Sequence, residues 1–364
     1  MKEYLRPHLF SFKAYSPGLT IEEVKDRYNL GQVIKLASNE NPLGVSPLVK
    51  DALDKYRDYV FRYPYAGNEP LRQELARFLN VPKSNIIIGN GSDEIIDLVL
   101  QLLVDPEKDS VLSFRPCFSI YKTQSRLHQI DLIQVDLEAD FKMDLQKLAA
   151  KVTSQTKLVF LTNPDNPSGF ALPKQELMSF IQDLPKGVFV LLDEAYIDFA
   201  DPEENYSFVD EFASFPQVIF LRTFSKLFGL AGIRLGYAVV NEVLADYFWR
   251  IRLPFSVNIL AEKAGIAALR DVFFREKTKK VVLEGRNFLS QELPKLGCQV
   301  FPSQANFLLV KPPLSPKLIF ENLLQKGIII RTLDSYGLPE YFRISIGTME
   351  ENRLFLERLG EILR

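Results

Sequence analysis

The stretch VIFLRTFSKLFGLAGIR, residues 218–234, places a short apolar run directly before two hydroxyls, a lysine and a glycine-rich turn. A continuous apolar run of this length is typical of a strand buried on both faces of a parallel sheet. Thr223, Ser225 and Arg234 are donors that suit a phosphate, and Lys226 supplies an amine. A single lysine after a strand is usually a solvated surface residue, so the role of Lys226 depends on motifs elsewhere in the chain.

Similar apolar runs recur upstream and downstream of this stretch, and helical periodicity lies between them. A helix is expected over residues 93–104, and the other strands are expected at 86–88, 111–114, 157–161, 188–192 and 235–240. Short apolar strands separated by helices predict an α/β fold with a mostly parallel sheet covered on both faces.

The pattern changes after about residue 254. Two helical stretches cover residues 257–293, short strands follow at 306–310 and 342–346, and a helix over 350–363 closes the chain. We therefore expect a large domain at 36–254 and a smaller α+β domain at 255–364. Residues 1–35, with a helix at 21–28, form an N-terminal arm that we expect to pack on the smaller domain.

Composition excludes several classes of protein. The 364 residues have a formal net charge of -2, so no nucleic-acid partner is expected. No apolar run reaches the roughly 18 residues of a membrane span, and the start resembles no secretory signal, which favours the cytoplasm. Two cysteines and two histidines form no CxxC, HExxH or Ser-His-Asp pattern, so neither a metal site nor a hydrolytic triad is expected. Proton transfer would then fall to a lysine or a cofactor.

Four motifs follow predicted strands, where ligands bind in open α/β sheets. Two of them suit a phosphate: the lysine stretch and the run Gly89-Asn-Gly-Ser-Asp-Glu94, which opens a helix. Ser92 adds a hydroxyl, whereas the carboxylates of Asp93 and Glu94 are expected to point away from a phosphate. An ordinary helix cap would explain this second run equally well.

The other two motifs suit an aromatic ring. Asn166 lies in the stiff turn NPDNPSG at 163–169, where the bond from Asn166 to Pro167 is a candidate cis peptide. Asp193 and Tyr196 follow a buried strand, and a buried carboxylate needs a cation such as a protonated pyridine. A plain turn and a capping aspartate are the simpler readings, but the four motifs together predict a pyridoxal phosphate site.

The chain resembles the fold-type-I pyridoxal phosphate-dependent aminotransferases, and within them most closely the histidinol-phosphate aminotransferases. The resemblance spans nearly the whole chain and rests on AYSPG at 14–18, LASNENP at 36–42, RYP at 62–64, GSDE at 91–94, NPDNPSG at 163–169, DEAY at 193–196, TFSK at 223–226, Arg234, GIIIR at 327–331 and FRISIGT at 342–348. It implies reversible transamination of L-histidinol phosphate and 2-oxoglutarate to imidazole-acetol phosphate and L-glutamate.

The resemblance also implies roles for individual residues. Lys226 would hold the cofactor covalently and move a proton, Asp193 would keep the pyridine nitrogen protonated, and Asn166 and Tyr196 would bind the phenolic oxygen. Phe118 occupies the ring-stacking position, where the family often has tyrosine. The phosphate would be bound by Ser92, Asp93, Thr223, Ser225, Arg234 and, from the neighbouring subunit of a homodimer, Tyr63.

The substrate pocket would be formed by three further residues. The family uses a pair of arginines, here Arg331 and Arg343, for the phosphate and carboxylate groups of its substrates, and Tyr15 would close the pocket from the arm.

Alternative functions remain open at this point. An aromatic amino-acid aminotransferase or a threonine-phosphate decarboxylase would keep the cofactor and change the substrate. A catalytically inactive binding or regulatory protein would keep only the fold, although the intact Lys226, Asp193 and Asn166 argue against it. A nicotinamide-dependent dehydrogenase would need a third glycine where Glu94 stands.

Overall fold

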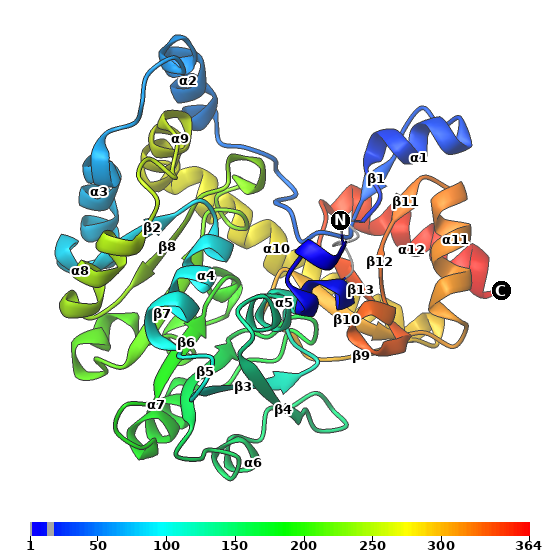
Figure 1. Ribbon diagram of the computed structural model, residues 1–364. Coiled ribbons are helices and arrows are strands. Elements are labelled where there is room, and N and C mark those ends of the chain that lie inside the picture. The colour runs from blue at the N-terminus through cyan, green and yellow to red at the C-terminus, as the bar shows by residue number, and fades with distance from the viewer. Residues whose placement is uncertain (1, 13–17) are drawn as a thin grey trace.

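A seven-stranded sheet forms the centre of the larger part of the molecule (Figure 1) in a computed structural model that describes residues 2–12 and 18–364. All neighbouring strands run parallel except β8, which is antiparallel to both of its neighbours. Their order across the sheet is β2 (Ile86–Gly89), β8 (Gly236–Val239), β7 (Val218–Thr223), β6 (Phe189–Asp193), β5 (Thr156–Thr162), β3 (Ser110–Arg115) and β4 (Asp131–Asp136). The prediction of an α/β fold with a mostly parallel sheet is therefore confirmed.

Helices bury both faces of this sheet. Along β5, Leu158 and Phe160 pack into one apolar cluster, and Val159 and Leu161 pack into another. This alternation explains why the strands are apolar at nearly every position. The surrounding helices are α2 (Pro47–Tyr56), α3 (Glu69–Leu79), α4 (Ser92–Leu103), α5 (Ser119–Leu127), α6 (Leu145–Ala149), α7 (Lys174–Asp183), α8 (Glu242–Ile251) and α9 (Ile259–Arg270).

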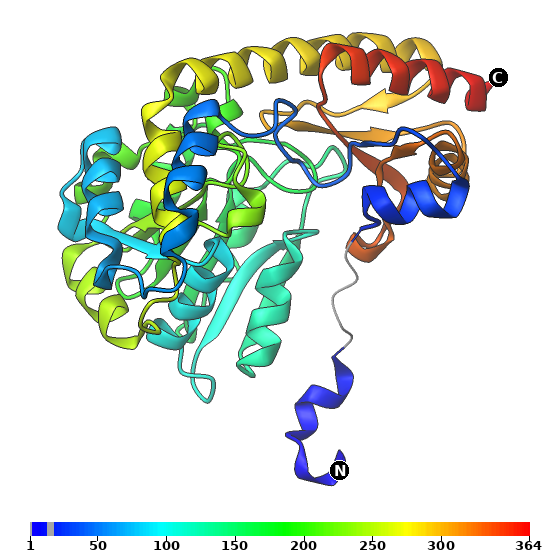
Figure 2. The ribbon, with the colours of Figure 1, turned by 90° about the horizontal axis from the view of Figure 1, so that it is seen from above.

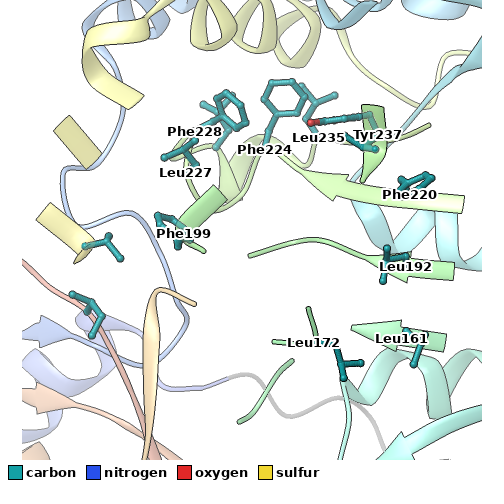
Figure 3. Close-up of a cluster of buried hydrophobic side chains, with 14 of the residues drawn as sticks. Leu161, Leu172, Leu192, Phe199, Phe220, Phe224, Leu227, Phe228, Leu235 and Tyr237 are labelled. Atoms are coloured by element: carbon teal, nitrogen blue, oxygen red, sulfur yellow. The ribbon is translucent and has the colours of Figure 1, made fainter. Parts of the chain in front are cut away.

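The larger apolar cluster continues around the lysine motif. Figure 3 shows Phe224, Leu227 and Phe228 turned into this cluster, next to Leu235 and Tyr237. Phe224, Leu227 and Phe228 are almost completely buried. These buried apolar side chains hold the backbone in place on both sides of Ser225 and Lys226.

A second, antiparallel sheet forms the smaller part of the molecule. Its strand order is β12 (Arg331–Leu333), β13 (Leu338–Ser345), β10 (Phe307–Lys311) and β9 (Gln299–Val300). The helices α11 (Pro316–Gln325) and α12 (Met349–Leu363) pack here, and the long α10 (Val272–Glu292) runs beside α12 from the larger part into the smaller one (Figure 2).

The N-terminal segment divides between the two parts. Helix α1 (Ile21–Tyr28) packs against α11, and β1 (Ile34–Lys35) pairs in parallel with β11 (Ile328–Ile329). The short helix at Pro7–Ser11 instead contacts α5 of the larger part, where the guanidinium of Arg126 lies over the ring of Phe12 at 4.9 Å.

The contacts of α9 bear on the predicted boundary between the domains at residues 254 and 255. This helix packs against α2 and α3 of the larger part. The contacts therefore favour a boundary near residue 271, where α9 ends and α10 begins, and the division into an arm and two domains stays a prediction. Within residues 2–12 and 18–364, no helix combines the length and the apolar character that crossing a membrane requires.

Candidate active site

A cavity of about 160 Å³ opens at the carboxyl ends of β5, β6 and β7, beside the N-terminus of α4. The chain crosses this edge of the sheet repeatedly, so distant segments meet there. The cavity brings together ten of the predicted site residues: Ser92, Asp93, Phe118, Asn166, Asp193, Tyr196, Thr223, Ser225, Lys226 and Arg234.

One end of the cavity is rich in hydrogen-bond donors. Helix α4 begins there at Ser92, and its N-cap Gly91 offers no side chain, so the first N–H groups of the helix lack a side-chain acceptor. The hydroxyls of Thr223 and Ser225 lie 3.0 Å apart. Arg234 donates from Nη2 to the carboxylate of Asp93 at 3.2 Å. A helix N-terminus, two hydroxyls and a guanidinium form an anion site.

The two acidic residues at the start of α4 behave differently from each other. Glu94 points away from the cavity, as predicted, and its Oε2 accepts a hydrogen bond from the hydroxyl of Ser256 at 3.1 Å. The expectation that Asp93 also points away is wrong, because Asp93 lines the cavity and pairs with Arg234. Partial burial raises the pKa of Asp93, while the charges of Arg234 and Lys226 lower it.

Lys226 is one of the residues that line the cavity. Its Nζ donates to the carbonyl oxygen of Ser38 at 3.1 Å and lies 5.5 Å from the centre of the Tyr196 ring. Burial, followed by the positive charge of Arg343, lowers the pKa of the Lys226 amine to about 8. The amine is therefore far easier to deprotonate near neutral pH than a solvated lysine.

Asp193 ends strand β6 and is only 3% exposed. Its Oδ1 accepts from the backbone N–H of Ala195 at 3.1 Å, and its Oδ2 accepts from the hydroxyl of Tyr121 at 2.7 Å. Burial raises the pKa of Asp193 to about 6, although the hydrogen bond from Tyr121 opposes this shift. The neighbouring Glu194 faces away and pairs with Arg222 at 2.8 Å.

Asn166 and Tyr196 form the wall that separates this cavity from the next. Asn166 donates from Nδ2 to the Tyr196 hydroxyl at 3.3 Å and accepts from Nη1 of Arg343 at 2.5 Å. Burial raises the pKa of the Tyr196 phenol to about 12, so it keeps its proton at neutral pH. The predicted cis bond before Pro167 is wrong: the cis peptide in this turn joins Asn163 to Pro164.

A second cavity of about 210 Å³ adjoins the first and shares Phe118, Asn166, Tyr196 and Lys226 with it. Arg331 from β12 and Arg343 from β13 line it and pair directly across the small sheet. Arg343 is buried, whereas Arg331 is partly exposed next to Gly18. Two guanidiniums beside an amine form a pocket for an anionic small molecule, such as a phosphate ester or a dicarboxylate.

Tyr63 is a predicted site residue that lines neither cavity. Tyr63 is 82% exposed, and its ring packs on Phe255 with centroids 4.9 Å apart. Tyr15 lies outside the residues that the structure describes.

The sequence placed Ala37–Asn39 within the motif at 36–42 but predicted no role for it, and this segment contacts the site at three consecutive positions. The carbonyl of Ala37 accepts from Nη2 of Arg343 at 2.8 Å, and the carbonyl of Ser38 accepts from Lys226. Asn39 donates from Nδ2 to the Tyr196 hydroxyl at 3.2 Å, and its Oδ1 accepts from the hydroxyl of Ser345 at 2.8 Å. The φ of Asn39 is 55°, in the left-handed region, which asparagine adopts more often than most other residues.

Tyr121 and Thr162 were also missed. A tyrosine on the buried face of a helix looks like an ordinary core residue in the sequence, and a threonine at a strand end looks like a β-former. The only signal was that a buried phenol requires a polar partner.

A family model described as aminotransferase class I and II matches residues 31–359. The chain belongs to this family. It is 48% identical to the histidinol-phosphate aminotransferase of Nitratidesulfovibrio vulgaris over 359 residues, which are 99% of this chain and 96% of that protein. It is 46% identical to the histidinol-phosphate aminotransferase of Oleidesulfovibrio alaskensis, covering 99% of this chain and 95% of the relative.

Among solved structures, the chain is similar to a crystal structure of histidinol-phosphate aminotransferase from Sinorhizobium meliloti in complex with pyridoxal-5'-phosphate. The TM-score is 0.90 at 28% sequence identity, and the match covers 99% of this chain and 98% of that one.

Proposed function

We propose that this chain is a pyridoxal phosphate-dependent histidinol-phosphate aminotransferase. The observation that carries the proposal is one cavity that is lined by Lys226, by Asp193 and by a set of donors suited to a phosphate. Membership of the aminotransferase family and the names of the relatives support both the reaction and the substrate.

The residues present fit the cofactor. A methyl group at Gly91 would lie 2.5 Å from Nη2 of Arg234, so the missing side chain leaves room for the guanidinium next to the N-terminus of α4. Ser92, Thr223, Ser225 and Arg234 would hold the phosphate, and Asp193 would meet the ring nitrogen. Phe118, which lines both cavities, would pack against the ring. When bound, pyridoxal phosphate supplies a reactive aldehyde and a ring that accepts electrons.

Each polar residue has a task that its surroundings support. The lowered pKa of Lys226 gives an amine that can act as nucleophile and as proton carrier. Asp193 is an acceptor for a proton on the ring nitrogen, and Asn166 and Tyr196 are donors for the phenolic oxygen. Arg343 contacts Asn166 directly, so the substrate pocket and the cofactor pocket share one hydrogen bond.

The substrate assignment rests on Arg331 and Arg343. Histidinol phosphate carries a phosphate, and glutamate carries two carboxylates, so both need cationic partners in the same pocket. We assign the buried Arg343 to the group nearest Lys226 and the more exposed Arg331 to the distal anion. Tyr15 is proposed to close the pocket.

A homodimer is also proposed, in which Tyr63 reaches the phosphate site of the neighbouring subunit. This role is supported by exposed apolar side chains in two segments of the chain, which meet where the ring of Tyr63 packs on Phe255. They are Tyr59, Val60, Phe61, Tyr63, Tyr65, Tyr247, Ile251, Leu253 and Phe255. A cytoplasmic location is proposed as well, and the free thiols of Cys117 and Cys298 fit a reducing compartment.

A substrate panel tests the proposed function. The protein is loaded with pyridoxal phosphate, and glutamate formation from 2-oxoglutarate is measured with histidinol phosphate or phenylalanine as the amino donor, while carbon dioxide release is measured with threonine phosphate. We expect histidinol phosphate to give the highest kcat/KM by at least about 100-fold, because its phosphate brings more negative charge into the cationic pocket than the single carboxylate of phenylalanine. Better turnover of either other compound would contradict the substrate assignment.

Mixing two variants tests the shared site. In a dimer of Lys226→Ala with Tyr63→Ala, one of the two sites keeps both residues only if Tyr63 acts across the interface. Random mixing should then restore about one quarter of the activity of the unmodified enzyme, since half of the dimers are mixed. Mixed samples no more active than the separate variants would show that Tyr63 does not act across the interface.

A further inference from the structure

Tyr121 lies behind the cavity on helix α5 and is 1% exposed. Its hydroxyl has two polar neighbours, Oδ2 of Asp193 at 2.7 Å and Oγ1 of Thr162 at 2.8 Å. The hydroxyl is sealed from bulk water, so these two neighbours decide where its proton points.

The number of protons fixes the direction of this chain of hydrogen bonds. An ionised carboxylate can only accept, so the single proton of Tyr121 must point toward Asp193. The Thr162 hydroxyl must then donate to the oxygen of Tyr121. Thr162 and Asp193 are direct partners across β5 and β6, which places both ends of the chain on one rigid edge of the sheet.

Packing holds the phenol ring in place. The ring of Tyr121 stacks on Phe160 with centroids 4.5 Å apart and an interplanar angle of 6°. On another side it meets Phe118 edge-on, with centroids 5.7 Å apart. The residue proposed to pack against the cofactor therefore also contacts the residue that donates to Asp193, and neither can shift alone.

We propose that Tyr121 is a positioning residue that keeps Asp193 in its carboxylate form, so that the proton shared with a bound pyridine ring stays on the ring nitrogen. This inference deepens the proposed function and rests on it. A donated hydrogen bond stabilises the charged carboxylate. Burial opposes ionisation of Asp193, as do the charges of Asp93 and Glu194, so few groups besides Tyr121 and the N–H of Ala195 favour it.

The variant Tyr121→Phe removes the hydroxyl and keeps the ring contacts with Phe160 and Phe118. In the holoenzyme loaded with pyridoxal phosphate labelled with ¹⁵N in the ring, we expect the ¹⁵N resonance to move from the protonated toward the unprotonated position. In the apoenzyme, the pKa of the Asp193 carboxyl, followed by ¹³C resonances and assigned with Asp193→Asn, should rise. We expect kcat to fall about tenfold, the equivalent of one pKa unit, with little change in KM.

Two further variants separate the hydrogen-bond chain from a general loss of packing. Thr162→Val should move the ¹⁵N resonance in the same direction by a smaller amount, and Thr162→Ser, which keeps a hydroxyl, should leave it in place. The Thr162 pair also provides the test if Tyr121→Phe does not fold.

The outcomes distinguish this inference from the proposed function. If the unmodified enzyme turns over histidinol phosphate but Tyr121→Phe leaves both the ¹⁵N position and the Asp193 pKa unchanged, the inference is overturned and the function stands. If the unmodified protein binds no pyridoxal phosphate, the proposed function is wrong, and so is the proposed effect of Tyr121 on the ring nitrogen. An unchanged apoenzyme pKa would refute the role of Tyr121 independently of any cofactor.

Discussion

Nζ of Lys226 donates a hydrogen bond to the carbonyl oxygen of Ser38, 188 positions earlier in the chain and 3.1 Å away. A carbonyl can accept from a charged or from a neutral amine, so this contact can orient Lys226 in either protonation state. The surrounding charges and burial decide that state, and this makes the reactivity of Lys226 sensitive to pH.

The rate at which the apoenzyme captures pyridoxal phosphate should follow the neutral fraction of Lys226. Because the pKa of Lys226 is lowered to about 8, the rate should reach half of its maximum near pH 8 and level off about one pH unit above it. The groups that set this pKa besides burial are Arg343, Glu40, Arg234 and Asp93. Stopped-flow absorbance across the pH range measures the profile.

Removing the charge of Arg343 should move this pH profile. Arg343 is the second-largest cause of the lowered pKa, after burial, so Arg343→Gln should shift the midpoint to higher pH. Arg358→Gln, on the exposed surface of α12, is the control and should leave the midpoint in place. A rate that still climbs steeply above pH 9 in the unmodified protein would contradict the assigned environment of Lys226.

Asn39→Ala should reduce both stability and turnover. The change removes the donor to Tyr196 and the acceptor for Ser345 and leaves buried partners unsatisfied, at a cost of about 1–3 kcal/mol. Asn80→Ala is a matched control, because Asn80 has the same φ of 55° as Asn39 and lies exposed at the end of α3. Urea unfolding measures both variants. Equal losses would mean that the backbone conformation, and not the side-chain bonds, explains the effect.

Gly91→Ala should weaken binding of pyridoxal phosphate about tenfold or more. A methyl group there would lie 2.5 Å from Nη2 of Arg234 and would displace the guanidinium, losing a charge-assisted contact of about 1.5–3 kcal/mol. Gly187→Ala shares the positive φ but has no atom within 4 Å of the added carbon, so it should lose only about 1–2 kcal/mol of stability. Equilibrium titration with pyridoxal phosphate compares the affinities of the two variants. An unchanged affinity in Gly91→Ala would contradict the assignment of Arg234 to the phosphate site.

The two arginines should differ in their kinetic effects. Arg343→Lys cannot keep both the bond to Asn166 and the bond to Ala37, so it should lower kcat as well as kcat/KM, the latter about 100-fold. Arg331→Lys should mainly raise KM for histidinol phosphate, because Arg331 is assigned to the distal anion. Arg358→Lys is the surface control. Steady-state kinetics test both variants. If Arg331→Lys lowered kcat and Arg343→Lys mainly raised KM, the substrate groups assigned to the two arginines would have to be exchanged.

The sequence predicted the α/β fold and those site residues that lie in motifs at the ends of strands. The carboxyl ends of parallel strands meet at one edge of a sheet, so such motifs come together there. Lys226, Asp193 and Asn166 belong to this group. Asn39, Ser38 and Tyr121 could not be predicted in the same way, because their contacts depend on side chains and carbonyls that meet only after the two parts of the molecule pack together. The turn at 163–169 shows a related limit: two Asn-Pro steps were visible, but the structure places the cis peptide at Asn163 and Pro164.

The bond between Asn39 and Ser345 spans 306 positions, and it joins a segment near the start of the chain to the end of β13. During synthesis, Lys226 and Asp193 leave the ribosome long before Ser345 does, so the wall of the cavity around Tyr196 is incomplete until the last strand has formed. A nascent chain therefore carries Lys226 without Arg343, one of the groups that lower its pKa, for the time needed to add more than a hundred residues, which takes about 5–20 s or longer at ordinary translation rates. We therefore expect a chain truncated within β13 to lose the cofactor, although every residue of the lysine motif is present.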